Sequence, residues 1–168
     1  MRRILILLIL LGLTAGCGYH FAGGGTAPGG IKKIAILVAK NSTSEPGIED
    51  TLTRAIIDEF IADGRIRVTA EENSDAVLYS NVISFETVAV SAVGERGEDY
   101  TVKMKVDFRL EDKEKKVLWK ESGMESNLRA DYKASTDVSS TRIAKEKAIS
   151  KYCKNIARDL ISSMFEGF

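Results

Sequence analysis

The chain has two cysteines and one histidine, the residue types best suited to thiol or imidazole chemistry: Cys17, Cys153 and His20. His20 is the only histidine, so the chain has no histidine-based triad or metal site of the usual kinds. Cys153 has the helical spacing of a core residue, and free cysteine is commonly buried. The glycine runs at 23–25 and 29–30 lack the lysine of a phosphate-binding loop. The sequence therefore predicts no catalytic residue, no metal site, no cofactor and no enzyme activity.

Cys17 stands at the exit of a secretory signal. The chain begins with Arg2 and Arg3, continues through an apolar run at residues 4–11, and leads through small residues into the cysteine. This order of basic, apolar and small residues is typical of a signal peptide. The apolar run is shorter than the roughly 20 residues that a helix needs to cross a bilayer. We therefore expect residues 1–16 to be a signal that is removed.

A cysteine directly after Ala15 and Gly16 resembles the lipobox of bacterial lipoproteins, although Thr14 stands where leucine is favoured. The resemblance implies that the Cys17 thiol is joined to a diacylglycerol and that acyl chains such as palmitate anchor the mature chain. Two or three acyl chains make a stable anchor without a membrane-spanning segment. The alternative is an ordinary signal peptide that is cleaved near a buried Cys17.

The charge balance bears on the partners of the chain, and the length bears on the number of domains. Removal of the signal takes away two arginines and no acid, which leaves 22 Lys+Arg against 24 Asp+Glu. Such a slightly acidic chain argues against nucleic acid as a partner. Residues 17–30 are glycine-rich and predict a flexible tether, whereas residues 31–168 are long enough for a single domain with its own core. With Cys17 acylated, Cys153 has no partner for a disulfide.

The first part of the domain predicts a strand followed by a helix. An apolar, β-branched run at residues 31–38 indicates a strand, and turn residues follow at 41–47. Residues 47–62 repeat apolar side chains every three or four positions, which predicts a helix with one buried stripe. Gly64 is well placed to end it in a left-handed conformation. A short extended piece follows at 66–68.

The middle of the domain predicts three longer strands. Residues 76–90 are rich in β-branched side chains and long enough to contain a bulge. After a connection at 94–99, apolar and polar residues alternate strictly over 100–110, which predicts one buried and one charged face. A charged turn at 112–115 leads into an antiparallel partner at 117–127.

A polar loop at 130–139 and an amphipathic helix at 140–165 close the domain. The order is β-α-β-β-β-α. Two helices with apolar stripes and a mostly antiparallel sheet of four strands predict an α+β fold, a two-layer sandwich with both helices packed on the sheet.

Several short motifs resemble one family. The stretch Cys17-Gly18-Tyr19-His20-Phe21 is similar to the mature start of the LptE family of lipopolysaccharide-assembly lipoproteins. Further similar segments follow in order along nearly the whole chain: Ser74-Asp75-Ala76-Val77-Leu78, Glu98-Asp99-Tyr100 and Val117-Leu118-Trp119, then an amphipathic helix. The opening stretch is the most specific of them.

The resemblance implies a partner protein. Members of this family pack two helices on a four-stranded sheet, complex with the outer-membrane β-barrel LptD, assist its assembly, and help deliver lipopolysaccharide to the outer leaflet. Gly18 replaces the aspartate that retains many lipoproteins at the inner membrane, which favours the outer membrane. The expected location is therefore lipid-anchored in the outer membrane, facing the periplasm or within the barrel lumen.

Lipopolysaccharide carries phosphates on an acylated disaccharide, so a site for it needs clustered Lys and Arg side chains. The alternation over 100–110 places Lys103, Lys105 and Arg109 on one face of a strand. Arg96 in the preceding loop and Arg142 at the start of the last helix are the other candidates for lipopolysaccharide binding.

Alternatives stay open for both the site and the function. The three strand cations could form a solvated face, or pair across strands with acids such as Glu121. The segment 33–43, followed by a helix, also resembles periplasm-facing lipoproteins that activate a peptidoglycan synthase or act in secretion. A third reading is an envelope lipoprotein with a purely structural role.

Overall fold

A computed structural model of the chain describes residues 27–92 and 98–166. The elements follow in this order: η2 (Pro28–Gly30), β1 (Lys33–Ile36), β2 (Lys40–Asn41), α2 (Ile48–Asp63), β3 (Arg67–Val68), η3 (Glu71–Asn73), β4 (Ala76–Ala92), β5 (Glu98–Asp112), β6 (Val117–Met124), β7 (Ala130–Lys133) and α3 (Val138–Glu166). The predicted lipidation residue Cys17, with His20 and Arg96, lies outside the described residues.

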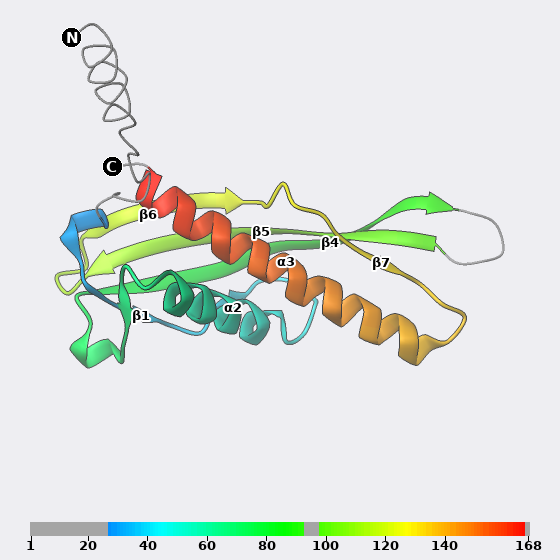
Figure 1. Cartoon of the computed structure of the whole chain (residues 1–168), viewed down its shortest axis with the longest axis horizontal. Helices are drawn as coiled ribbons and strands as arrows, with labels where there is room; N and C mark the ends of the chain where they lie inside the picture. The colour runs from blue at the N-terminus through cyan, green and yellow to red at the C-terminus, as the bar shows by residue number, and fades with distance from the viewer. Residues whose placement is uncertain (1–26, 93–97, 167–168) are drawn as a thin grey trace, which may run out of the picture.

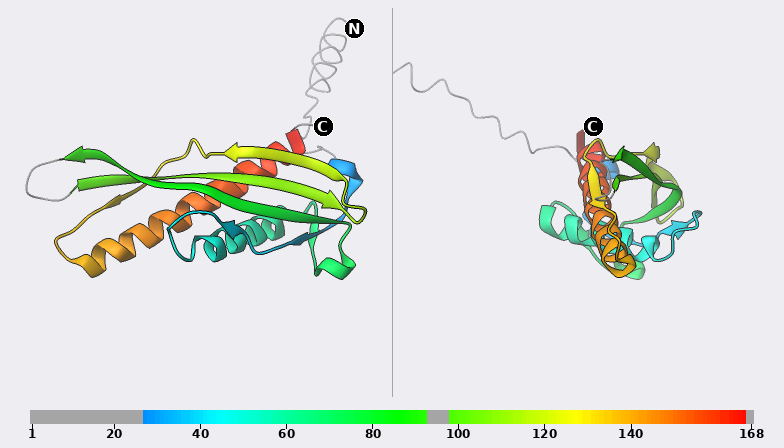
Figure 2. Two further views of the ribbon diagram at one scale, coloured as in Figure 1. Left: turned by 180° about the vertical axis from the view of Figure 1, so that it is seen from behind. Right: turned by 90° about the vertical axis from the view of Figure 1, so that its right-hand side faces the viewer.

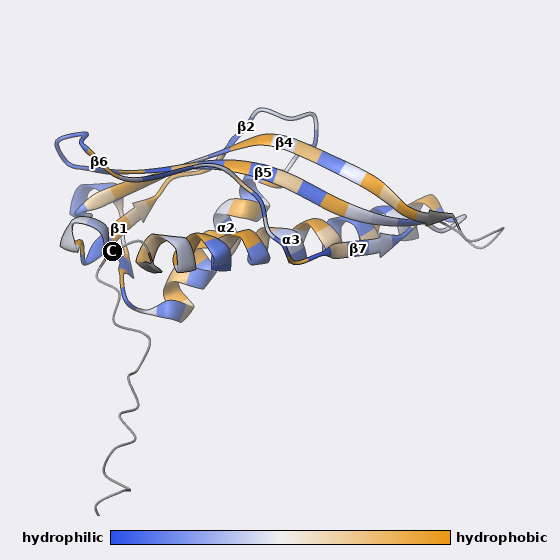
Figure 3. Ribbon diagram, turned by 90° about the horizontal axis from the view of Figure 1, so that it is seen from above, coloured by the Kyte–Doolittle hydropathy of each residue, from blue (hydrophilic) through white to orange (hydrophobic). Residues whose placement is uncertain are grey.

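The described strands form one mixed sheet in the order β3-β1-β4-β5-β6, with β2 added beside β4 and β7 beside β5. β1 runs parallel to β3 and β4, β2 runs parallel to β4, and the other pairs are antiparallel. Both helices lie on the same side of the sheet, α3 along its length and α2 beside it (Figures 1 and 3). We call the opposite side the outer face.

The helix α2 forms where the apolar spacing predicts it. Its buried stripe includes Ile48, Leu52, Ile56 and Phe60, none more than 1% exposed. Gly64 ends the helix in the left-handed region with φ 74°, and its N–H donates to the Phe60 carbonyl at 3.1 Å. This conformation favours glycine because it has no Cβ. The predicted helix end is confirmed.

The alternation predicted for β5 is also confirmed. Its inward side chains are almost fully buried against the helices: Val102, Met104, Val106, Phe108 and Leu110. β5 pairs with β4 over nearly the whole length of both strands, with register shifts between Val82 and Ser84 and between Ala89 and Ser91. The long pair spans the molecule from the end near η2 to the opposite tip (Figure 2).

The prediction of four strands in a mostly antiparallel sheet was wrong in detail, because the described sheet has seven strands and is mixed. The extended piece predicted at 66–68 contains β3, which adds a strand to the sheet. β2 has only two residues, and a periodicity of two cannot be recognised in so short a segment. β7 falls within the predicted loop at 130–139, and it pairs antiparallel with β5 from Asp99↔Lys133 to Val102↔Ala130. The α+β class and the two helices on one side are confirmed.

The last residues of the predicted tether pack on the domain. Pro28 is buried in η2, and Gly29 has φ 64°. A Cβ on Gly29 would lie 3.1 Å from the methyl carbons of Leu118 in β6. The chain therefore reaches the domain at the end of the molecule that carries β6. Within the described residues, no helix is both long and apolar enough to cross a membrane.

We use one name for the part of the sheet that extends away from this end. The distal ribbon consists of residues 84–92 of β4, residues 98–105 of β5, and β7. Figure 1 shows it reaching beyond α2 to the tip opposite η2.

Candidate functional site on the outer face of the sheet

The outer face carries the three cations predicted from the alternation of β5. Lys103, Lys105 and Arg109 are all exposed, while the residues between them are buried or half-buried. Both helices cover the other face (Figure 3). The structure therefore brings these three predicted residues together in one row that is open to solvent.

Two of the three cations have acidic neighbours. Lys105 Nζ lies 2.9 Å from Glu125 Oε1, and hydrogen bonding to this carboxylate raises the pKa of Lys105. Arg109 Nε lies 2.9 Å from Glu111 Oε1. Both cationic side chains are about half exposed, at 51% and 50%, so these pairs contribute little stability and can be exchanged for another anion. Glu121 is not the partner of either; its carboxylate lies 3.5 Å from Ser163 Oγ.

Lys103 has a different position in the row. It makes no ion pair within residues 27–92 and 98–166, and it stands opposite Glu86 in the β4–β5 register. Its ammonium group is a point charge on a flexible stem, which suits contact with a phosphate from several directions.

Two further cations that the sequence did not single out lie beside Arg109. Lys120 of β6 is its partner in the β5–β6 register, and Lys40 comes from β2. With Arg109 they line a hollow of about 430 Å³ on this face. Neither lysine makes an ion pair in the described part of the chain. Lys120 could have been found from the alternation of its own strand, but no local signal marks Lys40.

The same hollow has an apolar and aromatic side. Leu37 and Val38 contribute to its wall, and Val38 is 65% exposed. The Tyr79 ring lies under the Arg109 guanidinium at 5.2 Å from its centroid. Cations beside apolar surface suit a ligand with an anionic head and a hydrocarbon part.

A second hollow of about 440 Å³ lies at the distal end of the row. Lys103 lines it together with exposed apolar side chains, Val88 and Leu128, and with Arg129. Arg129 Nε lies 3.3 Å from Asp131 Oδ1. Lys103 and Arg109 are six positions apart on one strand, a distance of about 20 Å at 3.4 Å per residue. The row of cations therefore connects two hollows of mixed character.

Arg142 does not belong to this face. It lies on α3, where its guanidinium Nη1 is 2.9 Å from Glu146 Oε1. The hollow that it lines is formed with the start of α2 and includes the Lys145–Glu45 pair, whose Nζ and Oε2 atoms are 2.7 Å apart. The structure thus separates Arg142 from the other described candidates.

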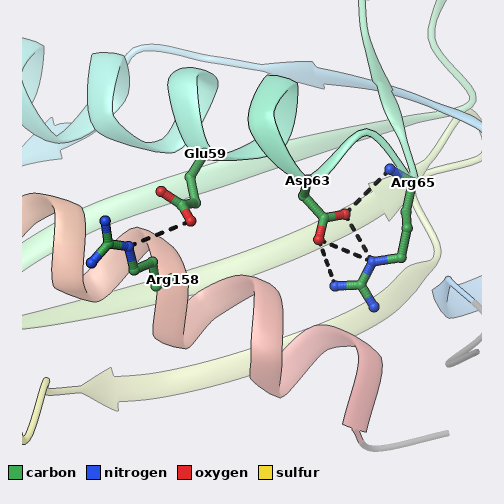
Figure 4. Close-up of polar contacts among 4 residues, drawn as sticks. All are labelled: Glu59, Asp63, Arg65 and Arg158. Atoms are coloured by element: carbon green, nitrogen blue, oxygen red, sulfur yellow. Dashed lines mark hydrogen bonds and ion pairs between the residues drawn. The ribbon is translucent and has the colours of Figure 1, made fainter. Parts of the chain in front are cut away.

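The remaining polar contacts near the helices hold the fold together. Arg158 of α3 pairs with Glu59 of α2 at 3.5 Å, and Asp63 binds Arg65 through two carboxylate oxygens (Figure 4). The Arg65 guanidinium also lies 3.5 Å from the centroid of the Phe165 ring. These contacts join α2, the turn after it and the end of α3.

Cys153 is fully buried, and burial raises the pKa of its thiol to about 12. A thiol in that state is protonated at neutral pH and is a poor nucleophile. The described residues also contain no group of three or more His, Cys, Asp or Glu side chains that could hold a metal ion. The cations and apolar side chains of the outer face suit binding through charge and apolar contact.

Comparison with known proteins gives one family match and several similar folds. A family model described as "LptE: Lipopolysaccharide-assembly" matches residues 31–164. A candidate lipoprotein from Caulobacter crescentus has 13% identity and a TM-score of 0.54, with 77% of this chain and 89% of that chain covered. The hypothetical protein CT253 from Chlamydia trachomatis has 9% identity and a TM-score of 0.51, covering 78% and 94%. At such identities these structures show the fold alone. No curated protein matches the chain.

Proposed function

The chain belongs to the LptE family of lipopolysaccharide-assembly proteins, and on this basis we propose that it is an outer-membrane lipoprotein. Its partner in this proposal is an LptD-like β-barrel. In this role it assists assembly of the barrel and delivery of lipopolysaccharide to the outer leaflet. It acts by binding, with Cys17 carrying the lipid anchor and Gly18 permitting transfer to the outer membrane.

The observation that carries the binding part of the proposal is the open row of Lys103, Lys105 and Arg109 between two hollows. Lipopolysaccharide carries phosphates on an acylated disaccharide, and its acyl chains need apolar surface. Lys and Arg bind phosphates strongly because the hydrogen bonds are charge-assisted. The hollow beside Arg109 supplies Lys40, Lys120 and the apolar wall at Leu37. A polar sheet face also suits a protein that is enclosed in a water-filled barrel lumen.

Gentle detergent extraction of the full-length lipoprotein, followed by mass spectrometry, tests the partner. We expect a large outer-membrane β-barrel to co-purify with it. Recovery of a penicillin-binding synthase in place of a barrel would instead support an activator of peptidoglycan synthesis and contradict the proposal. A variant with Cys17 replaced by serine, kept as a control, should leave the membrane fraction.

Replacement of Lys103, Lys105 and Arg109 together by glutamine tests the ligand site. Glutamine removes the three charges without placing new acids beside Glu125 and Glu111. We expect lipopolysaccharide binding to weaken about tenfold or more, since each lost charge-assisted contact is worth more than 1 kcal/mol. The matched control replaces three exposed lysines of α3 by glutamine: Lys147, Lys151 and Lys154. Equal binding by both folded triple variants would remove the row from the site.

A further inference from the structure

The two edges of the distal ribbon have different neighbours. On one side β5 pairs with β7, and β7 in turn packs against α3. On the other side β4 pairs with β1 at Ala76–Leu78 and with β2 at Asn81 and Val82. Beyond Val82 no described strand pairs with this edge of β4. One edge of the ribbon is therefore closed by a helix, while the other is open.

The open edge contains a regular run between two bulges. The register shifts lie on either side of Ser84 to Ala89, so these six residues keep an uninterrupted ladder with β5. The run contains no lysine, proline or glycine, and Glu86 is its only charge. Exposed strand edges are normally protected by lysine, proline or a covering element. Thr87, Val88 and Ala89 are all exposed, so no described element covers the end of this run.

The ladder also shows which backbone groups are free to pair. The carbonyls of Leu78 and Val82 accept hydrogen bonds from Leu37 and Ser42, so the backbone groups of these residues face away from β5. In an antiparallel pair the two directions alternate along the strand, and the extra residue Ile83 at the bulge shifts this alternation by one. Beyond the bulge, the outward groups accordingly belong to Phe85, Thr87 and Ala89.

We propose that an extended segment of the barrel protein pairs with residues 84–89 of β4 as an additional strand of the sheet. The inference rests on the proposed function, because the barrel is its partner there. β1 and β2 pair one after the other with the earlier part of the same edge of β4. The added strand continues this series beyond the bulge. Main-chain hydrogen bonds provide the affinity in this mode of recognition.

The chemistry of the edge defines the added segment. The strands of a closed barrel have no free edge, so the segment is an extended loop or terminal part of the barrel protein. Val88 and Val90 are exposed next to the edge, at 38% and 43%, so apolar side chains of the segment lie beside them. A second copy of this chain is the less suitable occupant. Six residues form a strand only about 20 Å long, which by itself falls short of the roughly 1,200 Å² of a stable interface. A barrel that encloses the chain, as in the proposed function, adds contacts outside this edge.

Thr87→Pro in the full-length lipoprotein, expressed together with its barrel, tests the pairing. Proline removes the outward N–H without removing a bond to β5. Thr87→Val is the matched control, because it keeps the N–H and the shape of the side chain. We expect Thr87→Pro to reduce the recovered barrel about tenfold, and Thr87→Val to leave it unchanged. Equal recovery with both variants would overturn the inference while the proposed function stands.

A photo-crosslinking residue at Ala89 gives a second measurement that does not depend on the folding of the proline variant. We expect a crosslink to the barrel protein, mapped to a loop or terminal segment. A crosslink between two copies of this chain would overturn the choice of occupant. If the wild-type lipoprotein recovers no barrel at all, both the proposed function and this inference fail.

Discussion

β4 passes through two different environments, and the contrast separates the well-packed half of the sheet from its open edge. From Ala76 to Val82 the strand has neighbours on both edges, and Ala76, Leu78 and Val82 are fully buried. Beyond the bulge β5 is its only neighbour among the described strands, and Val88 is 38% exposed. The same β-branched composition thus serves as core in one half of the strand and as open surface in the other.

The helices follow the same division. α2 packs beside the early part of the sheet only, while α3 continues along its length to the distal ribbon (Figure 1). Apolar burial is therefore concentrated in the part of the sheet that both helices cover. Because burial of apolar surface is the main source of stability, we expect that part to determine the free energy of unfolding.

The largest expected effect comes from the core of the helix-covered half. Phe60→Ala removes a fully buried ring of α2, and we expect it to lower the free energy of unfolding by about 3–5 kcal/mol. Ile61→Ala is the matched control, because the neighbouring side chain is 64% exposed. Urea denaturation measures both. If Val90→Ala in the distal ribbon costs as much as Phe60→Ala, the division between a well-packed half and an open half is wrong.

A smaller effect is expected where α3 connects the two halves. The buried Tyr152 hydroxyl accepts the Ser126 N–H at 3.2 Å and donates to the Ser126 carbonyl at 3.3 Å. Tyr152→Phe removes both bonds, and we expect a loss of about 1 kcal/mol. Hydrogen exchange should become faster at residues 126–133, while the amides of α2 keep their protection. Uniformly faster exchange throughout would mean that both halves open as one unit.

Much of the fold could be predicted from the sequence because, in a long helix or strand, the spacing of the apolar residues indicates which side is buried. The helix stripe with Phe60, its end at Gly64 and the alternating strand with Phe108 depend on local spacing and needed no knowledge of neighbours. The β7 segment could not be found in this way. Four residues show too little alternation, and Ala130 is buried because β5 and α3 happen to meet there.

The part of the candidate site that lies on one strand could also be predicted from local periodicity. Lys103, Lys105 and Arg109 share a strand, so a period of two was enough to place them together. Lys40 and Lys120 reach the row from other strands, and their approach depends on the parallel pairing of β2 with β4 and on the β5–β6 register. Arg142 has the right charge, but α3 lies on the opposite side of the sheet.

The smallest expected effect tests the polar contacts that close the well-packed half. Hydrogen bonds from the Arg65 guanidinium hold the pKa of Asp63 below its usual range. A carboxylate whose pKa is lower in the folded state stabilises the fold above the unfolded pKa of about 4, and this stabilisation is lost as the pH falls through the folded pKa. Since the pair is partly exposed, we expect Asp63→Asn to cost about 0.5–1 kcal/mol at pH 7 and close to nothing at pH 2. Denaturation of both proteins across this pH range measures the difference, with Asp58→Asn on the same helix as the control for losing a charge. A constant difference at all pH values would show that Arg65 is held by its contact with Phe165 and not by the carboxylate.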